Sequence, residues 1–429
     1  MTEIKKFPIH NGHILGLAAA LFLPVGVFLS KGLAPLFAVA AVSCLVLGLW
    51  RNRAIPFVLG PVTVALGALV SWALVSWFWS FTPDETLKTG FSLVGTFFGG
   101  AVLFAAGAAL GAGEKRVFQN GIILGGVIGF PLIAVEFASD AWLTQAMYGL
   151  IQRGTFNVFG DHTNVLNPGM AATALFFWSW ALVMWARFSS FVFIPAILAG
   201  IGLISQTYAD AVVLSFAVGA VVFTTTLAWP RWAPWVLGAG VALGVLVTPA
   251  IPGLLPNPLM MKTKLSWLSS SSAHRIVIWN NTVGHIKQKP LLGGGFDTAR
   301  GLYNNKDRVT YTFPKGINGD FFQVQYEPIP LHPHNAILQL WLELGAVGAL
   351  VGLGLLLSIL RAIDRGIKNR TSRAVAFGLF TTALSLGSVS FGIWQGWWLS
   401  SILLSASFLI SSLQSTLGGD CPPPVEETG

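Results

Sequence analysis

The chain has 429 residues, of which 54% are hydrophobic and only 10% are charged, and its formal net charge is +8. Soluble globular domains carry about a quarter charged residues. So few charged side chains cannot cover the surface of a water-soluble protein. The composition therefore excludes a soluble globular protein and predicts a surface that mostly faces lipid. The positive charge is therefore read by its position between membrane spans, and nucleic-acid binding is not expected.

Apolar runs long enough to cross the hydrocarbon core as helices recur along the sequence. They are continuous rather than alternating, which favours helices over a β-barrel. We place them at 13–30, 32–50, 54–80, 89–112, 120–139, 168–186, 190–208, 211–229, 233–250, 335–360, 375–394 and 396–413. The predicted fold class is an all-α polytopic membrane protein, with about twelve transmembrane helices and a large, partly helical periplasmic loop.

Two segments interrupt the alternation of spans and short loops. The first nine spans fall within 1–250, and a short outer loop near 140–167 separates two of them. The long segment 251–334 is predicted to form a loop domain. Residues 335–413 hold the remaining spans, and the polar tail 414–429 is expected to be disordered.

One helix is predicted inside the long loop. The serines at 269–272 can cap its start. Apolar residues then recur at helical spacing, at Ile276, Trp279, Val283 and Ile286. Pro290 ends the helix, and three glycines at 293–295 form a turn, which we call the glycine turn. The apolar face of this helix is expected to lie on the membrane domain or on its surface.

Lysines and arginines are distributed unevenly among the short loops. With the N-terminus inside, the short outer loops hold only Lys31 and Lys88. The inner loops hold Lys5, Lys6, Arg51, Arg53, Lys115, Arg116, Arg187, Arg231, Arg361, Arg365, Lys368, Arg370 and Arg373. This excess of inner positive charge predicts cytoplasmic N- and C-termini, with both long loops on the periplasmic side.

The strongest local motif is His-Pro-His-Asn at 332–335, at the mouth of the tenth span. Asn335 can cap that helix, which would hold the His334 imidazole at the outer interface. Histidine titrates near neutral pH and can accept a proton from a hydroxyl group. Gly345 and Gly348 lie one turn apart and are expected to pack closely against another helix. The alternative is an interfacial histidine above a glycine packing face, without catalysis.

The spacing His-Asn, nine residues, Gly-x-x-Gly resembles the signature of the O-antigen ligase and polymerase superfamily. His334, Asn335, Gly345 and Gly348 match it position by position. Upstream, 274–295 resembles the arginine helix and glycine turn of that family. The Arg-Gly-Thr-Phe-Asn sequence that begins at Arg153, together with Asn164, resembles the shorter outer loop of the family.

The resemblance implies a membrane glycosyltransferase of GT-C-like architecture. Such enzymes take a glycan from undecaprenyl diphosphate outside the inner membrane, and the ligases deliver it to lipid A–core oligosaccharide. We therefore expect an inverting, metal-independent O-antigen ligase, with no cofactor and no metal ligands. The expected partners are the lipid-linked glycan donor, the lipid A–core acceptor and membrane lipid.

A lipid diphosphate leaving group requires its developing negative charge to be stabilised, by a metal or by fixed cations. Arginine presents a planar fork that suits phosphate oxygens and stays charged. Arg275 near the start of the loop helix and Arg153 in the shorter loop are the candidates, with His334 as a base on the acceptor hydroxyl or as a group that orients it. The alternative for each arginine is a solvated charge or a headgroup contact.

The remaining assignments concern substrate binding and structure. Substrate binding is assigned to Asn335, His332, His274 and Gly294. Glu343 lies within the tenth span, about 13–14 Å along the helix axis from His334. It is too far to share a proton with that histidine, so a structural role, together with Gly345 and Gly348, is preferred.

Other polar and aromatic residues receive weaker interpretations. Glu136 and Asp210 are interpreted as ordinary interface residues near the outer ends of their helices. Trp394, Trp397 and Trp398 form an outer-face cluster that is expected to anchor the chain at the membrane interface.

Alternative functions stay open on the sequence. An O-antigen polymerase or a protein O-oligosaccharyltransferase would use the same donor with a different acceptor. A lipid or polysaccharide transporter would move its substrate without changing a bond, and a membrane scaffold would lack any catalytic role. The ligase is preferred because the motif spacing matches closely. Most charges sit at loops and interfaces rather than at the bilayer midplane, which weighs against a transporter.

Overall fold

The computed structural model describes residues 9–152, 165–207, 209–255, 270–302, 309–315, 320–326 and 328–413. The first part of the chain forms α1 (Asn11–Phe28), α2 (Leu33–Asn52), α3 (Pro61–Val75), α4 (Pro83–Ala108), α5 (Ala112–Ala138), α6 (Trp142–Gln152), α7 (Asn167–Arg187), α8 (Ser190–Ser205), α9 (Asp210–Ala228) and α10 (Ala233–Val247). The second part forms α12 (Ser270–Gln288), β1 (Val309–Lys315), β2 (Asp320–Tyr326), α13 (Ala336–Gly366), α14 (Arg370–Val389) and α15 (Gly396–Ser412).

Most of these helices have the length and composition of membrane spans. Among the described residues, 10 helical segments are long and apolar enough to cross a bilayer, and α8 and α15 are shorter apolar helices. The predicted fold class, an all-α polytopic membrane protein, is confirmed. The predicted spans agree with the helices to within a few residues at most ends, because an apolar run of about 20 residues is a local property of the sequence.

Helix α7 lies at the centre of the bundle, and 83% of its most apolar 18-residue stretch is buried. Helices α1, α5, α9, α14 and α15 pack around it. The rings of Phe22, Phe176 and Phe408 meet within the core, with centroids 5.6 to 6.3 Å apart. Helices α1 and α5 cross closely because each has a glycine at the crossing point, Gly16 on α1 and Gly121 on α5. A Cβ on Gly121 would lie 2.1 Å from the carbonyl oxygen of Gly16.

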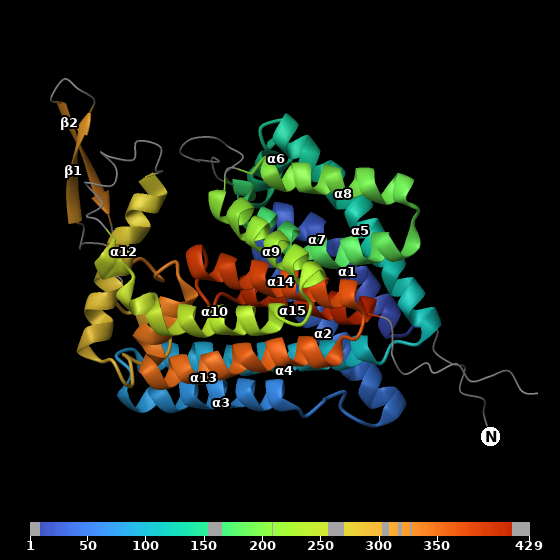
Figure 1. Cartoon of the computed structure of the whole chain (residues 1–429), viewed down its shortest axis with the longest axis horizontal. Helices are drawn as coiled ribbons and strands as arrows, with labels where there is room; N and C mark the ends of the chain where they lie inside the picture. Colours follow the sequence, from blue (N-terminus) through green and yellow to red (C-terminus); the bar gives the residue numbers. More distant parts are fainter. Residues whose placement is uncertain are drawn as a thin grey trace, which may run out of the picture.

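A second group of helices lies beside this centre. Helices α3, α4 and α13 form a layer on one side of the molecule, and α6 and α8 lie on the other side (Figure 1). Helix α10 packs on α13, and α14 contacts α9 and α13.

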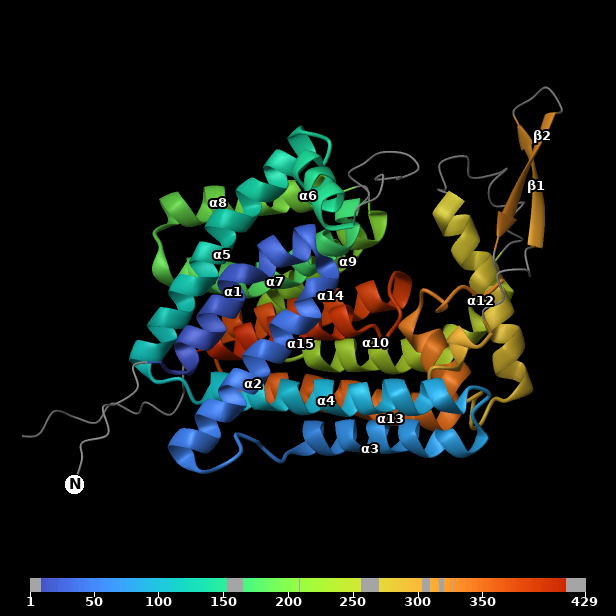
Figure 2. The same cartoon turned by 180° about the vertical axis from the view of Figure 1, so that it is seen from behind.

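The α12 helix and the β-hairpin lie at one end of the long helices, as both views show (Figures 1 and 2). We call this the α12 end of the bundle. The start of α13 and the connection between α14 and α15 lie there as well, since His334 bonds to Ser390.

The predicted loop helix is confirmed as α12. Its apolar face packs on the first turns of α13, in a cluster formed by Trp279, Val283, Ile286, Ala299, Leu302, Leu338, Trp341 and Leu342. The indole N–H of Trp279 also donates to the carbonyl of Pro333, at 3.1 Å. The helix is therefore attached to the same short segment that carries His334.

The hairpin β1–β2 was not predicted from the sequence. Its antiparallel register pairs Val309 with Tyr326, Tyr311 with Val324 and Phe313 with Phe322. Apolar residues alternate with polar ones along β1, which is the period-two signal of a strand.

Candidate functional site

Helix α13 is interrupted at Gly345, whose backbone is non-helical (φ 65°, ψ −165°). The glycine turn lies against this break. The N–H groups of Gly294 and Gly295 donate to the carbonyls of Leu342 and Glu343, each at 2.9 Å. The loop thus satisfies helix carbonyls that the break leaves without intrahelical donors, as non-helical backbone at membrane depth requires.

The N–H groups on the other side of the break are satisfied in the same way. Ala346 donates to the carbonyl of Pro290 at 2.8 Å, and Val347 donates to the carbonyl of Leu291 at 3.3 Å. The glycine turn and the two halves of α13 therefore form one hydrogen-bonded unit.

Only glycine fits at the two points of closest approach. A Cβ on Gly345 would lie 2.3 Å from the carbonyl oxygen of Leu291, and one on Gly293 would lie 2.4 Å from that of Glu343. Both glycines also have positive φ, at 65° and 70°.

This geometry corrects the expected role of the motif glycines. Gly345 breaks the helix and contacts the loop, rather than packing a continuous helix against a neighbouring one. A Cβ on Gly348 would lie 2.1 Å from the Leu344 side chain of the same helix. The sequence spacing could not reveal this, because Gly-x-x-Gly within an apolar run is also the pattern of a helix packing face.

Glu343 is fully buried beside the break. Its Oε2 accepts from the backbone N–H of Asp297 at 2.8 Å and from the indole N–H of Trp394 at 2.6 Å. Its Oε1 accepts from the Gln339 amide at 2.9 Å, and that amide oxygen accepts from the N–H of Ile393 at 3.0 Å. The carboxylate therefore joins α13, the segment after the glycine turn and the connection between α14 and α15.

Asp297 follows the glycine turn with a left-handed backbone (φ 57°) and is buried. Its Oδ2 accepts from the Thr89 hydroxyl of α4 at 2.6 Å, and the Nε of Arg300 lies 3.0 Å from the same oxygen. Burial raises the pKa of the Asp297 carboxyl, while the Thr89 hydrogen bond and the Arg300 charge oppose that rise. The carboxylate thereby anchors an arginine whose side chain is 44% exposed.

A small polar pocket of about 40 Å³ opens at this ion pair. It is lined by Asp297, Arg300, Leu331, His332, Gln339, Gly392, Trp394 and Gln395, and we call it the Arg300 pocket. The Nδ1 atom of His332 is buried there without a hydrogen-bond partner. Burial, aided by His334, lowers the pKa of His332 to about 4, so this imidazole is neutral at neutral pH.

His334 lies next to this pocket, with its ring 4.3 Å from that of His332 in an edge-on arrangement. Its Nδ1 lies 2.6 Å from the carbonyl oxygen of Ser390. A carbonyl can only accept, so Nδ1 carries the proton, and Nε2 of the neutral ring keeps its lone pair. Burial lowers the pKa of His334, and the charges of Arg275 and His274 lower it further, while the bond to Ser390 opposes the shift.

Arg275 lies in the first part of α12, within electrostatic range of both His334 and Asp210. Burial lowers the pKa of its guanidinium, and the charge of Asp210 opposes that shift. The structure therefore brings Arg275, His274 and His334 together. Asp210, interpreted as an ordinary interface residue, faces Arg275 from the first turn of α9. Arg153 lies outside the described residues.

Asn335 caps α13, as predicted: its Oδ1 accepts from the N–H groups of Ile337 and Leu338, both at 3.0 Å. The cap fixes the backbone next to His334, which has a positive φ of 53°. Gly294 was assigned to substrate binding, but its N–H donates to Leu342 and is already used by the fold.

The structure contradicts the sequence interpretation of three side chains. Trp394 and Trp398 are buried, with 6% and 1% of their surface exposed, so they do not anchor the chain at a membrane interface. Glu136 is also buried, and it accepts from the N–H groups of Leu143 and Thr144 at the start of α6. The sequence did not reveal these partners, because they lie on other helices: Trp394 donates to Glu343 of α13, and Glu136 accepts from the start of α6.

Sequence reasoning gave no role to Asp297 or Arg300. Residues 297–300 follow the glycine turn directly, so their proximity to that turn was the available signal. Among the described residues, no three His, Cys, Asp or Glu side chains group as candidate metal ligands.

Comparisons with known proteins cover the part of the chain that forms this site. Residues 195–353 match a family model described as O-antigen ligase. This range includes α12, the glycine turn, His334 and the break in α13. A Rickettsia felis protein named "Putative polysaccharide ligase" is 26% identical over 332 residues, which are 77% of this chain and 75% of the relative. A Rickettsia bellii protein of the same name is 28% identical over 341 residues, with the same two shares.

The fold and these relatives define a multi-pass membrane protein similar to polysaccharide ligases. Residues 195–353 are thus similar to the O-antigen ligase family, and most of the chain is similar to two proteins named as putative polysaccharide ligases.

Proposed function

We propose that the protein is an O-antigen ligase that transfers a glycan from undecaprenyl diphosphate to lipid A–core oligosaccharide. The observation that carries this proposal is a neutral His334 with an unprotonated Nε2, held next to Arg275 and the Arg300 pocket. A base beside fixed cations is the arrangement that glycosyl transfer from a diphosphate requires.

Arginine side chains bind the donor diphosphate in this proposal. Arg275 and Arg153 are the sequence candidates, and the anchored, half-exposed Arg300 joins them. Guanidinium groups match phosphate oxygens in a two-point geometry and stay charged, so they neutralise the diphosphate without a metal.

The transfer is a single displacement at the anomeric carbon. The acceptor hydroxyl gives its proton to Nε2 of His334, and its oxygen forms the new bond to that carbon. The bond from the anomeric carbon to the diphosphate oxygen breaks, and undecaprenyl diphosphate leaves with the electron pair. Attack from the face opposite the leaving group inverts the configuration. The arginines stabilise the charge that develops on the leaving diphosphate.

The neighbouring residues position the substrates. His332 is neutral and lines the Arg300 pocket, so its ring can contact a sugar bound there. His274 lies near His334 and binds the donor or acceptor with it. Asn335 holds His334 in place through its cap, and Glu343 holds the glycine turn.

The α12 end is proposed to face the periplasm across the inner membrane. The opposite end carries Arg187, which bonds to Gln119, and Arg373, which pairs with Asp364. Further basic residues follow at the same end of α13 and at the start of α14. This clustering of positive charge supports a cytoplasmic location for that end and for both termini, with the 251–334 loop domain over the site outside.

Transfer by the purified protein tests the proposal. The donor is undecaprenyl-diphosphate glycan, the acceptor is lipid A–core, and a chelator is present throughout. We expect a shifted lipopolysaccharide band that falls by about 10²- to 10⁴-fold with His334→Ala. It should persist with His285→Ala, a control histidine in the last turn of α12.

Other outcomes would assign another function. Lengthening of the lipid-linked glycan would indicate a polymerase, and modification of a protein acceptor would indicate an oligosaccharyltransferase. Movement of the donor across a vesicle without a change of bonds would indicate a transporter. Loss of transfer with the chelator would contradict metal independence.

A further inference from the structure

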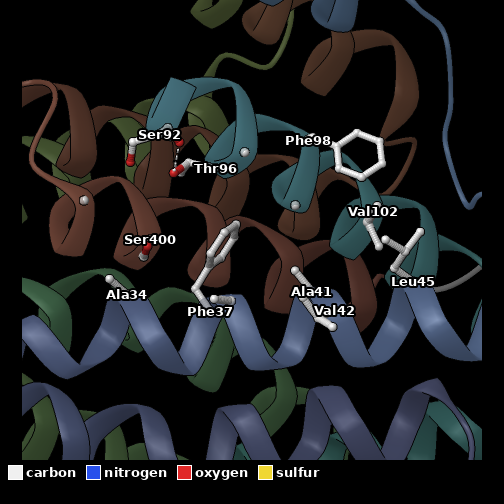
Figure 3. Close-up of a pocket in the computed structure, with 14 residues that line it drawn as sticks. Ala34, Phe37, Ala41, Val42, Leu45, Ser92, Thr96, Phe98, Val102 and Ser400 are labelled. Carbon is white, nitrogen blue, oxygen red and sulfur yellow. Dashed lines mark hydrogen bonds between the residues drawn. The ribbon is translucent and has the colours of Figure 1, made fainter. Parts of the chain in front are cut away.

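An apolar cleft lies between α2, α4 and α15 (Figure 3). Its volume is about 350 Å³, within the range of ligand pockets. Small residues leave the space: Ala34, Ala38, Ala41, Gly95, Gly99 and Gly396 line it. Phe37 and Val102 contribute to its walls, and the exposed Val42 and Phe98 lie at its rim. The cleft is therefore open sideways to the surrounding lipid.

The polarity of the cleft changes along its length. Ser92, Thr96 and Ser400 lie on the first parts of α4 and α15, toward the α12 end. The Thr96 hydroxyl bonds to the carbonyl of Ser92 in its own helix at 2.8 Å, so it leaves the wall apolar. Beyond these residues the lining is hydrocarbon only, at Val42, Leu45 and Val102.

The upper end of the cleft adjoins the Arg300 pocket through two elements. On α4, Thr89 bonds to Asp297 of the pocket, and Ser92 of the cleft follows one helical turn later. On the connection to α15, Gln395 lines the pocket and Gly396 lines the cleft. A ligand with a charged head and a hydrocarbon tail could therefore contact both sites at once.

The length of the cleft corresponds to one leaflet. From Ala34 to Leu45, α2 rises about 16 Å at 1.5 Å per residue. Half of the hydrocarbon core of a bilayer is about 15 Å. A chain that fills the cleft is therefore about as long as one leaflet of the hydrocarbon core.

We propose that this cleft binds the polyprenyl tail of the donor, with its diphosphate at the Arg300 pocket. This inference rests on the proposed function, because the identity of the head group comes from it. Three observations favour a polyprenyl chain over a passing bilayer lipid: the cleft adjoins the cationic pocket, it is lined by small residues along a single-leaflet length, and it admits a chain from the side.

Photo-crosslinking tests the cleft without any transfer reaction. The probe is a polyprenyl phosphate with a diazirine in its chain, added to the full-length protein in detergent. We expect labelled peptides from α2 and α4 that undecaprenyl phosphate competes away and phosphatidylglycerol does not. Equal competition by both lipids, or the absence of cleft labelling, would overturn the proposal.

Filling variants provide a matched comparison. A Cβ on Gly95 meets nothing within 4 Å, so Gly95→Leu enters the cleft without a backbone clash. A Cβ on Gly67 of α3 also meets nothing within 4 Å, and Gly67→Leu is the control. Ala38→Leu at the exposed rim is a second filling variant, in case Gly95→Leu folds poorly.

We expect Gly95→Leu to reduce cleft labelling about tenfold, and to lower the KM preference for a polyprenyl donor over a farnesyl donor by a similar factor. Gly67→Leu should change neither. Unchanged labelling and preference in both filling variants would overturn the tail site. A wild-type protein that is labelled in the cleft but transfers no glycan would contradict only the proposed function.

Discussion

The hydrogen bond from His334 to Ser390 defines the chemistry open to this imidazole. It places the proton on Nδ1 and leaves the lone pair on Nε2. Burial and the charges of Arg275 and His274 keep the ring neutral by lowering its pKa. A neutral histidine is a competent base, whereas a protonated one could only donate.

The pH dependence of transfer follows from this environment. Because the pKa of His334 is lowered, the base form is already present below pH 6.5, and kcat/KM should rise with pH along an acid limb centred below that value. Arg275→Gln removes one of the charges that lower this pKa, so the acid limb of the residual activity should move to higher pH. A limb that stays in place or moves down would contradict the pairing of these residues.

Arg300 is a residue whose importance only the structure indicates. We expect Arg300→Gln to reduce transfer by about 10²-fold, because the donor diphosphate loses a cation that is already oriented by Asp297. Arg300→Lys should recover part of the activity, since it keeps the charge and loses the two-point geometry.

The Arg373–Asp364 pair provides the control for this experiment. It is an ion pair of the same type, 3.3 Å long, at the opposite end of the bundle. Transfer by purified Arg373→Gln should match the wild type. Equal losses in the Arg300 and Arg373 variants would indicate a general effect on folding rather than a role in donor binding.

At the scale of elements, the broken helix α13 and the glycine turn form the frame of the site. Four backbone hydrogen bonds cross between them, and Glu343 adds contacts from its side chain. Three N–H groups donate to Glu343, from Asp297, Trp394 and Gln339. A carboxylate has enough acceptor sites for all three donors. A glutamine in its place would point its NH₂ group, which is itself a donor, at one of these N–H groups.

Alanine at either point of closest approach should destabilise this frame. Gly345→Ala and Gly293→Ala each place a Cβ within 2.4 Å of a carbonyl carbon or oxygen, at a backbone conformation with positive φ. We expect a loss of at least about 2 kcal/mol, seen as a lower unfolding temperature in detergent.

Gly354→Ala in the same helix is the control, because its Cβ meets nothing within 4 Å. It should leave the unfolding temperature unchanged or raise it slightly, since alanine favours a helix over glycine. Similar unfolding temperatures for all three variants would contradict the interlocked arrangement.

At the scale of the whole molecule, the two ends of the bundle differ in charge and in structure. One end holds α12 and the polar site, and the other holds most of the basic residues between helices. The positive-inside tendency predicts that the second end faces the cytoplasm.

Cysteine labelling tests this orientation. Gly284 on α12 and Gly366 at the end of α13 are both exposed, and a Cβ at either position meets no other atom within 4 Å. In a Cys421→Ser background, where the remaining Cys44 is buried, an impermeant maleimide should label Gly284→Cys in intact spheroplasts. It should label Gly366→Cys only after permeabilisation, and the reverse pattern would contradict the topology.

Much of the fold could be predicted because its signals are local. Spans depend on apolar length, and α12 depends on apolar spacing followed by a proline and glycines. The cap by Asn335 is likewise a local contact between adjoining residues. The sequence also placed His334 at a helix start and Arg275 on a loop helix, and the resemblance to one superfamily included both residues.

The rest of the site depends on contacts between distant segments. Asp297 meets Glu343 and Thr89 only because the glycine turn enters the break in α13. Trp394 looked like an interface residue because aromatic composition carries no information about a buried hydrogen-bond partner.

The sequence by itself determined a polytopic helical membrane protein, the position of its long loops and the His-Asn segment at a helix start. These follow from apolar length, periodicity and capping chemistry, which neighbouring residues set. Only the tertiary structure decided that α13 is broken, that Arg300 is anchored beside His332, and that an apolar cleft adjoins this pocket. Those features arise where segments far apart in the chain satisfy one another's backbone groups and fill one another's space.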